Sequence, residues 1–156
     1  LTSIGEFAFF NCTNLALTAL PDGVTSIGTQ AFADCTKLAL TELPNGMRSI
    51  GQGVFFGCTS LALTELPDNI TSIAGYAFQD CTHLALTEIP SCVTSIGPCA
   101  FQGCTGLTEL TFTSNPAPEL SDSVFEGCGD GLKIHIPPRQ RATAKTVGPR
   151  RILHTM

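Results

Sequence analysis

The chain has 156 residues, of which 43% are hydrophobic and 13% are charged, with no Trp. This composition is that of an ordered protein and excludes a low-complexity linker. Residues 1–132 hold all 13 acidic residues and two basic ones, Lys37 and Arg48, a net charge of −11, whereas residues 133–156 hold the other six basic residues. The acidic body argues against nucleic acid as the main partner. No run approaches the roughly 18 apolar residues of a membrane span, so no membrane insertion is predicted.

The sequence repeats with a period of 23 residues. The stretch CTKLALTELPNG at 35–46 returns as CTSLALTELPDN from Cys58 and as CTHLALTEIPSC from Cys81. Copies of the full unit, each opening with TSIG or a close variant, begin at residues 1, 24, 47, 70 and 93. A constant period of this length with regularly placed Leu and Ile predicts a solenoid of leucine-rich repeats. Because the core of a solenoid grows by stacking, five units and a closing unit suffice for one domain.

Within each unit, the order of residues predicts successive elements. The leucines of LALTEL predict a short strand, and Pro44 ends it because proline has no N–H for a ladder. The following Asn-Gly favours a turn, and Ile50 returns the chain inward in an extended segment. Phe55 then precedes Cys58 by three residues, the spacing of one helical turn. The predicted fold class is therefore an α/β solenoid: a right-handed leucine-rich repeat superhelix with one parallel β-sheet and short helical turns.

The pattern VTSIGxxAFxxCTxLxxxxLP resembles the BspA-type leucine-rich repeats of surface proteins from host-associated bacteria and mucosal protist parasites. The resemblance covers residues 1 to about 136, with the period, SIG, AF, C and LP all in phase. It implies a non-enzymatic protein-binding module, at the cell surface or secreted, that adheres to host or matrix proteins. A sheet face with equivalent side chains every ~4.8 Å would engage an extended protein or glycan through many weak contacts.

The solenoid is predicted to cover residues 1–136, and the rest of the chain differs from it. The closing unit, 113–136, is similar to the last segment of BspA-type arrays and is looser, because Cys128 follows Cys104 by 24 residues. Residues 137–156 show no trace of the repeat, and their Pro and Arg content predicts a basic, disordered tail. The chain begins part-way into a repeat, which indicates a fragment of a longer array.

Two registers are open for the strand segment, and they expose different residues. The family usually has a polar residue where Leu40 stands and an aliphatic one where Thr41 stands. If Leu38 and Leu40 point inward together, Ala39 and Thr41 and their equivalents form a threonine ribbon. In the family register, an acidic column faces outward instead, and we expect this column to bind a basic partner, directly or through a divalent cation. The column consists of Glu42, Glu65 and Glu88.

The eight cysteines fall into two groups. Six recur with the period: Cys12, Cys35, Cys58, Cys81, Cys104 and Cys128. Their spacing is not that of a metal site, and a buried Cys behaves as a small hydrophobe, so we expect an internal ladder of reduced thiols. A disulfide between neighbouring units remains the alternative. Cys92 and Cys99 lie outside the pattern and either form a disulfide with each other or are independent surface substitutions.

The sequence shows no catalytic or cofactor site. His83 occupies a variable surface position, and neither it nor His135 or His154 is in phase with a nucleophile. No GxGxxG, P-loop or HExxH motif occurs, and the acidic residues recur with the period instead of converging on one pocket. We expect no enzyme activity, no cofactor and no metal, and a monomeric binding module. A structural spacer in a longer array is the alternative, because near-identical units favour extension over a specific site.

Overall fold

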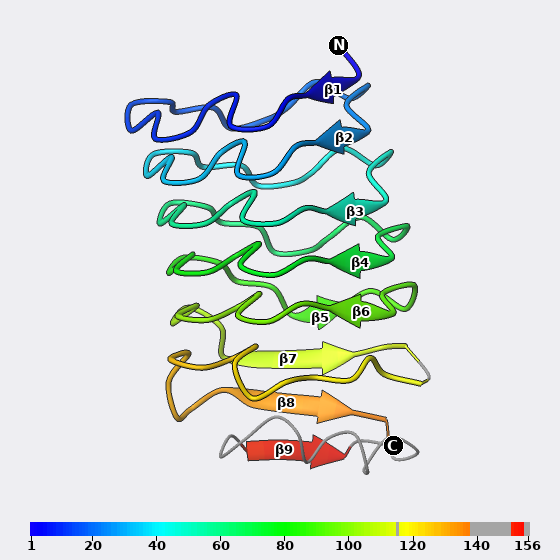
Figure 1. Ribbon diagram of the computed structural model, residues 1–156. Helices are drawn as coiled ribbons and strands as arrows, with labels where there is room; N and C mark the ends of the chain where they lie inside the picture. The colour runs from blue at the N-terminus through cyan, green and yellow to red at the C-terminus, as the bar shows by residue number, and fades with distance from the viewer. Residues whose placement is uncertain (115, 138–150, 155–156) are drawn as a thin grey trace.

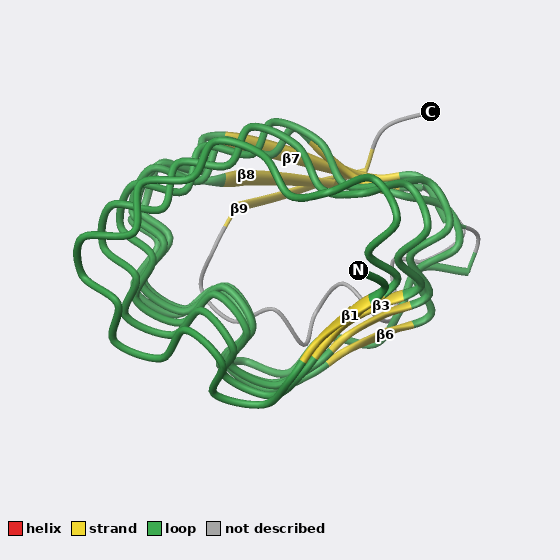
Figure 2. Ribbon diagram, turned by 90° about the horizontal axis from the view of Figure 1, so that it is seen from above, coloured by secondary structure: helices red, strands yellow, loops and turns green. Residues whose placement is uncertain are grey.

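The structure is a computed structural model that describes residues 1–114, 116–137 and 151–154. The chain winds in successive units that stack along one axis, with the N-terminus at one end and the C-terminal strands at the other (Figure 1). Seen along this axis, the units superpose and surround one interior (Figure 2). The strand register pairs residues 23 apart, such as Ser3 with Ser26, which confirms the predicted period. We number units 1 to 5 from their first residues and call 113–136 the closing unit.

Short parallel strands run along one side of the stack, which we call the serine strip. In each strand a Ser is followed by a buried Ile, because alternate residues of a strand point to opposite sides. These strands are β1 (Ser3–Ile4), β2 (Ser26–Ile27), β3 (Ser49–Ile50), β4 (Ser72–Ile73) and β6 (Ser95–Ile96). Strand β1 pairs with β2, and β3, β4 and β6 form a separate sheet. The sequence predicted this segment as extended but placed the parallel sheet elsewhere in the unit.

A second set of parallel strands lies on the opposite side of the stack (Figure 2). These strands are β5 (Glu88–Ile89), β7 (Glu109–Phe112), β8 (Lys133–Ile136) and β9 (Arg151–His154), paired in this order. The prediction of one parallel sheet is therefore wrong. Each unit has two extended segments, one on each side of the stack. Each segment lies beside the equivalent segment of the next unit, so parallel pairing occurs on both sides. We call the LALTEL stretch of each unit, residues 38–43 in unit 2 and 61–66 in unit 3, the leucine segment. Strands were predicted there, but these two segments form no strand.

Tight turns connect the serine strip to the leucine segment, and the described residues contain no helix. Every second N–H closes a local turn, as from Phe10 to the carbonyl of Phe7 (3.1 Å). The N–H groups between them donate to the next unit, as from Phe9 to the carbonyl of Ala31 (2.7 Å). A helix would use these groups within itself, so tight turns replace the predicted helical turns where the units are joined. The right-handed winding stays a prediction.

Columns of like side chains fill the interior. Six Phe rings stack nearly parallel, with neighbouring centroids 5.3 to 5.9 Å apart: Phe9, Phe32, Phe55, Phe78, Phe101 and Phe125. The periodic cysteines lie beside them, and each thiol from unit 2 onward donates to a Phe carbonyl of the preceding unit, as from Cys58 Sγ to Phe32 (3.0 Å). Five of these cysteines are buried, and Cys12, in unit 1, is half-buried. The expected internal ladder is therefore present.

The last strand lies in a segment for which the sequence predicted none. Arg151–His154 belongs to the stretch expected to be a disordered tail, but it forms β9 and pairs in parallel with β8. Residues 138–150 and 155–156 of that stretch lie outside the described residues. The looser closing unit is visible in the register of β7 and β8, which pairs Glu109 with Lys133, 24 residues later.

Candidate binding face

The candidate binding residues lie on the leucine segments of units 2 to 4. In unit 2, Leu40 and Leu43 are buried, and the two residues between them, Thr41 and Glu42, are both exposed. Strict alternation would bury one of two adjacent residues, but the chain bends at Thr41, so both side chains reach solvent. Each register considered from the sequence is thus correct in part. Leu38 and Leu40 point inward together, and Glu42 still faces outward.

Stacking turns these exposed pairs into two columns, which we call the Thr–Glu face. It consists of Thr41, Glu42, Thr64, Glu65, Thr87 and Glu88, all exposed. The glutamate column continues into unit 5 as Thr111, which pairs with Glu88. Neighbouring carboxylates are attached to backbones ~4.8 Å apart. Among the described residues, no ion pair involves any of the three glutamates, so no described cation compensates their charge.

The backbone of this face is sparsely bonded between units 1 and 4. The N–H groups of Ala39, Ala62 and Ala85 each donate to a leucine carbonyl of the preceding unit, at 3.0 to 3.3 Å. Over the part of the chain that is described, the Thr–Glu pairs of units 2 and 3 make no backbone hydrogen bond to a neighbouring unit. Because backbone N–H and C=O are strong hydrogen-bonding groups, the face offers them to a partner beside the hydroxyls and carboxylates.

Between units 4 and 5 the backbone of this side is hydrogen-bonded, because the sequence of unit 5 is shifted in register. Glu109 and Leu110 stand where unit 4 has Leu86 and Thr87. Glu109 is exposed and Leu110 is buried, so residues 109–112 alternate regularly and form β7. The N–H of Thr111 then donates to the carbonyl of Thr87 (3.0 Å). The part of this side with few backbone hydrogen bonds between neighbouring units therefore extends from unit 1 to unit 4.

The C-terminal end of the face holds an acid–base pair that the sequence did not predict. Nε2 of His135 lies 2.8 Å from Oε1 of Glu109, and their side chains are 14% and 59% exposed. In the register of β7 and β8, His135 pairs with Thr111 and so continues the glutamate column. The contact joins residues 26 positions apart, which the 23-residue period alone does not bring together.

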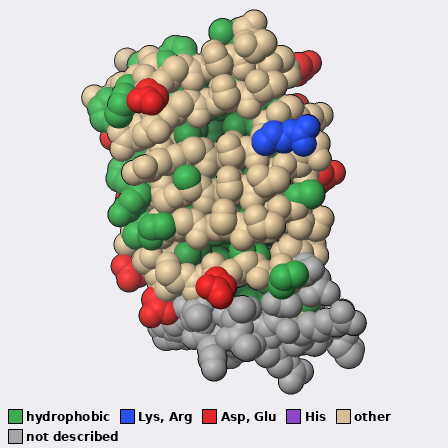
Figure 3. Space-filling view, turned by 45° about the vertical axis from the view of Figure 1, so that its right-hand side comes forward, with side chains coloured by type: hydrophobic (Ala, Val, Ile, Leu, Met, Phe, Trp, Pro, Cys, Tyr) green, Lys and Arg blue, Asp and Glu red, His purple; other side chains and the backbone are tan. Residues whose placement is uncertain are grey.

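A metal ion in the described residues, 1–114, 116–137 and 151–154, would require a cluster of ligating side chains. This part of the chain has no group of three His, Cys, Asp or Glu side chains that could hold a metal ion. It also has no helix long and apolar enough to span a bilayer. Figure 3 shows one side of the molecule, where acidic side chains are scattered over a largely uncharged surface.

The two cysteines outside the ladder are not joined in the structure. Cys92 is an exposed free thiol just before β6, and Cys99 is a half-buried free thiol just after it, so this strand separates them. A disulfide between them stays a prediction. In the interior, burial raises the pKa of four thiols: those of Cys35, Cys58, Cys81 and Cys104.

We expect a thiol reagent to label Cys92 and Cys99 of the native protein far faster than the buried cysteines. The thiolate is the reactive form, and burial both hinders access and keeps the interior thiols protonated. Iodoacetamide labelling followed by peptide mass spectrometry would measure each rate, with labelling in denaturant as the control in which all eight react alike. Equal native rates, or a disulfide between Cys35 and Cys58, would contradict the internal ladder.

A family model describes this arrangement of units. The BspA type leucine rich repeat region matches in six copies, over residues 1–91 and 75–145. The chain belongs to the BspA-type leucine-rich repeat family. This BspA-type chain is similar to a solved leucine-rich repeat protein of T. pallidum, with a TM-score of 0.74 and 29% identity, over 95% of this chain and 77% of that one. No curated protein matches at a significant level.

Two further solved structures are similar to the BspA-type chain. A leucine rich cell surface protein from Faecalibacterium prausnitzii A2-165 has a TM-score of 0.59 and 26% identity, over 88% of this chain and 53% of that one. A leucine-rich repeat protein from Bacteroides ovatus ATCC 8483 has a TM-score of 0.60 and 30% identity, over 86% of this chain and 40% of that one. The chain therefore spans about half, or less, of these two proteins.

Proposed function

We propose that this BspA-type solenoid is a protein-binding module at the cell surface or secreted, which works without catalysis and adheres to host or matrix proteins. Family membership supports a binding role, and the similar F. prausnitzii protein is described as a leucine rich cell surface protein. Stacked units present the same groups repeatedly, so an extended protein or glycan gains many weak contacts at once. We infer that the chain binds as a monomer through the Thr–Glu face.

The observation that carries this proposal is the exposed column of Glu42, Glu65 and Glu88, which forms no ion pair with any described residue. Units 2 and 3 form no strand here, but their glutamates are stacked in the same way as like charges on neighbouring strands, which cost about 0.2 to 1 kcal/mol per pair. A basic partner would relieve that repulsion, and charge complementarity would also speed its approach. The threonine hydroxyls and unpaired backbone groups beside the carboxylates add hydrogen-bonding partners without further charge.

Replacing all three glutamates, by Glu42→Gln, Glu65→Gln and Glu88→Gln, should raise stability slightly at low salt and weaken partner binding. The gain in the free energy of unfolding should be about 0.4 to 2 kcal/mol, from the two neighbouring pairs, and should shrink as salt screens the charges. Urea unfolding at two salt concentrations measures the stability. Biolayer interferometry on immobilised extracellular matrix proteins and mucin glycans measures binding, whose salt dependence should fall.

A matched control variant tests whether binding depends on the position of the lost carboxylates or only on their number. Glu6→Gln, Asp122→Asn and Asp130→Asn also remove three carboxylates, all exposed and outside the Thr–Glu face. This control should bind as the wild-type chain does. If a matrix protein binds the face variant and the wild type equally well, the acidic column is not the binding site.

A structural spacer is the second candidate, and the sameness of the units favours it. The Phe rings repeat with nearly constant geometry from unit 1 to the closing unit, with interplanar angles of 9 to 16°. A spacer requires this regular stack but no complementary face. Failure of the wild-type chain to bind any member of the matrix and mucin panel would favour the spacer over the binding module.

A further inference from the structure

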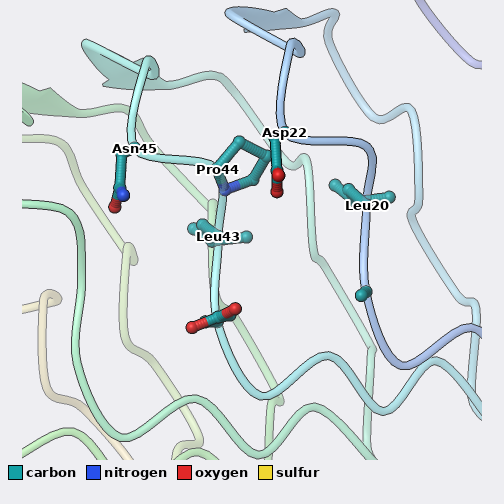
Figure 4. A pocket seen from close by; sticks show the side chains of 7 residues that line it. Leu20, Asp22, Leu43, Pro44 and Asn45 are labelled. Atoms are coloured by element: carbon teal, nitrogen blue, oxygen red, sulfur yellow. The ribbon is translucent and has the colours of Figure 1, made fainter.

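A hollow of about 80 Å³ opens between units 1 and 2, beside the first glutamate of the Thr–Glu face (Figure 4). Unit 1 and unit 2 run next to each other here, and both contribute to its walls. The lining residues are Ala19, Leu20 and Asp22 from unit 1, and Glu42, Leu43, Pro44 and Asn45 from unit 2. The hollow exceeds the roughly 30 Å³ that one water molecule takes in the liquid, so it admits a larger polar group.

Unit 1 departs from the repeat at one of the positions that line the hollow. Ala19 stands at the place of Glu42, Glu65 and Glu88 in the following units. Its single methyl group leaves open the space that the methylenes of a glutamate would cover. Among the described residues, no backbone hydrogen bond joins residues 40–46 to unit 1, so the main chain does not close the gap either.

The walls of the hollow combine an apolar base with a negatively charged rim. Leu20 and Leu43 are 8% and 4% exposed and form the base. Asp22 and Glu42 are exposed carboxylates from opposite sides, and neither has an ion-pair partner in the described part of the chain. Neither Lys37 nor Arg48 lines the hollow. A ligand that fits must therefore be apolar at its inner surface and positively charged at its head.

We propose that this hollow binds one arginine side chain of an extended partner segment. The proposal rests on the proposed function of the Thr–Glu face, because Glu42 belongs to both. The methylene stem of arginine packs on Leu20 and Leu43, while its guanidinium reaches the rim, a division that long basic side chains favour. The planar fork of five N–H donors suits two carboxylates and the amide oxygen of Asn45. A calcium ion fits less well, since it takes about six to eight oxygen ligands.

Titration with N-acetyl-L-arginine amide tests the proposal directly. Nuclear magnetic resonance spectra of the labelled full chain should show shifts at Ala19, Glu42 and Asn45. N-acetyl-L-citrulline amide has nearly the same shape without the charge, and it should bind at least about threefold more weakly, in line with one or two exposed ion pairs. Equal binding of the two compounds, or shifts confined to residues outside the hollow, would overturn the proposal.

Three single variants test whether arginine amide binds in the hollow or responds only to the net negative charge of the protein. Ala19→Gln fills the space without adding charge, and Asp22→Asn removes one carboxylate from the rim, so each should weaken arginine amide binding about threefold or more. Asp68→Asn removes one carboxylate at the position equivalent to Asp22 two units later, which is exposed, lies outside the Thr–Glu face and does not line the hollow, and it should leave binding unchanged. Equal losses with Asp22→Asn and Asp68→Asn would show a net-charge effect only and would overturn the proposal.

The same variants distinguish the hollow from the wider face. If a matrix protein loses affinity for the triple glutamine variant but not for Ala19→Gln, the hollow proposal fails and the proposed binding face stands. If Ala19→Gln weakens that binding and Asp68→Asn does not, the hollow is supported as the anchor within the face. If arginine amide binds as expected but no matrix protein does, the hollow stands and the adhesive function fails.

Discussion

Phe55→Ala should lower the free energy of unfolding by about 3 to 5 kcal/mol, the usual loss for a truncated buried Phe. The Phe55 side chain is fully buried and stacks between Phe32 and Phe78, with ring centroids 5.9 and 5.7 Å away. Removing the ring leaves a cavity that flanking units cannot fill, because their own rings are held in the same column. Urea unfolding measures the loss.

The exposed phenylalanine Phe10 provides the control for this prediction. Its side chain is 47% exposed at the outer surface of unit 1, so Phe10→Ala should change stability by about 0.5 kcal/mol or less. In a stack where each unit contacts only its neighbours, hydrogen exchange in Phe55→Ala should quicken most in units 2 to 4. Similar losses for the two variants would mean that the Phe column does not dominate the core.

Gly97→Ala should destabilise the protein by about 1 to 3 kcal/mol, as expected for overpacking against fixed atoms. An added methyl group at Gly97 would lie 2.8 Å from Cα of Gly75 and closer still to the nitrogen of that residue. These are backbone atoms of the preceding unit, so no side-chain rotation relieves the clash. The two units would have to separate, which weakens the pairing of β4 and β6. Thermal and urea unfolding measure the change.

Gly51 occupies the same position two units earlier and serves as the matched control. A methyl group there would meet its nearest atoms, in Val54 and Ile27, at 3.4 and 3.5 Å, which is ordinary contact. Unit 4 already carries Ala74 at this position. Gly51→Ala should therefore be neutral or stabilising by up to about 1 kcal/mol, because it restricts the unfolded chain. A loss as large as that of Gly97→Ala would show that the position requires glycine for another reason.

The sequence alone predicted the stacking of units and most of the interior. The period brings identical residues together in successive units, so the burial of Phe55 and Cys58 followed from their recurrence and apolar character. The exposure of Glu42 was predicted by only one of the two registers, the family register, and that part of the prediction is confirmed. Family membership could be predicted for the same reason, since every conserved letter of the repeat falls in phase.

Only the tertiary structure decided which backbone segments pair and where the face opens. A strand, a bend and a tight turn all fit the same short stretch of apolar and polar residues, and the choice depends on hydrogen-bond partners 22 to 26 residues away. That is why parallel strands occur on two sides of the stack, and why Thr41 and Glu42 are exposed together. The hollow at Ala19 needs two neighbouring units in register, and β9 needs the edge of β8. The sequence of one unit determines which side chains are apolar and are buried. Hydrogen bonds between units determine the backbone conformation, and with it which polar side chains are exposed together.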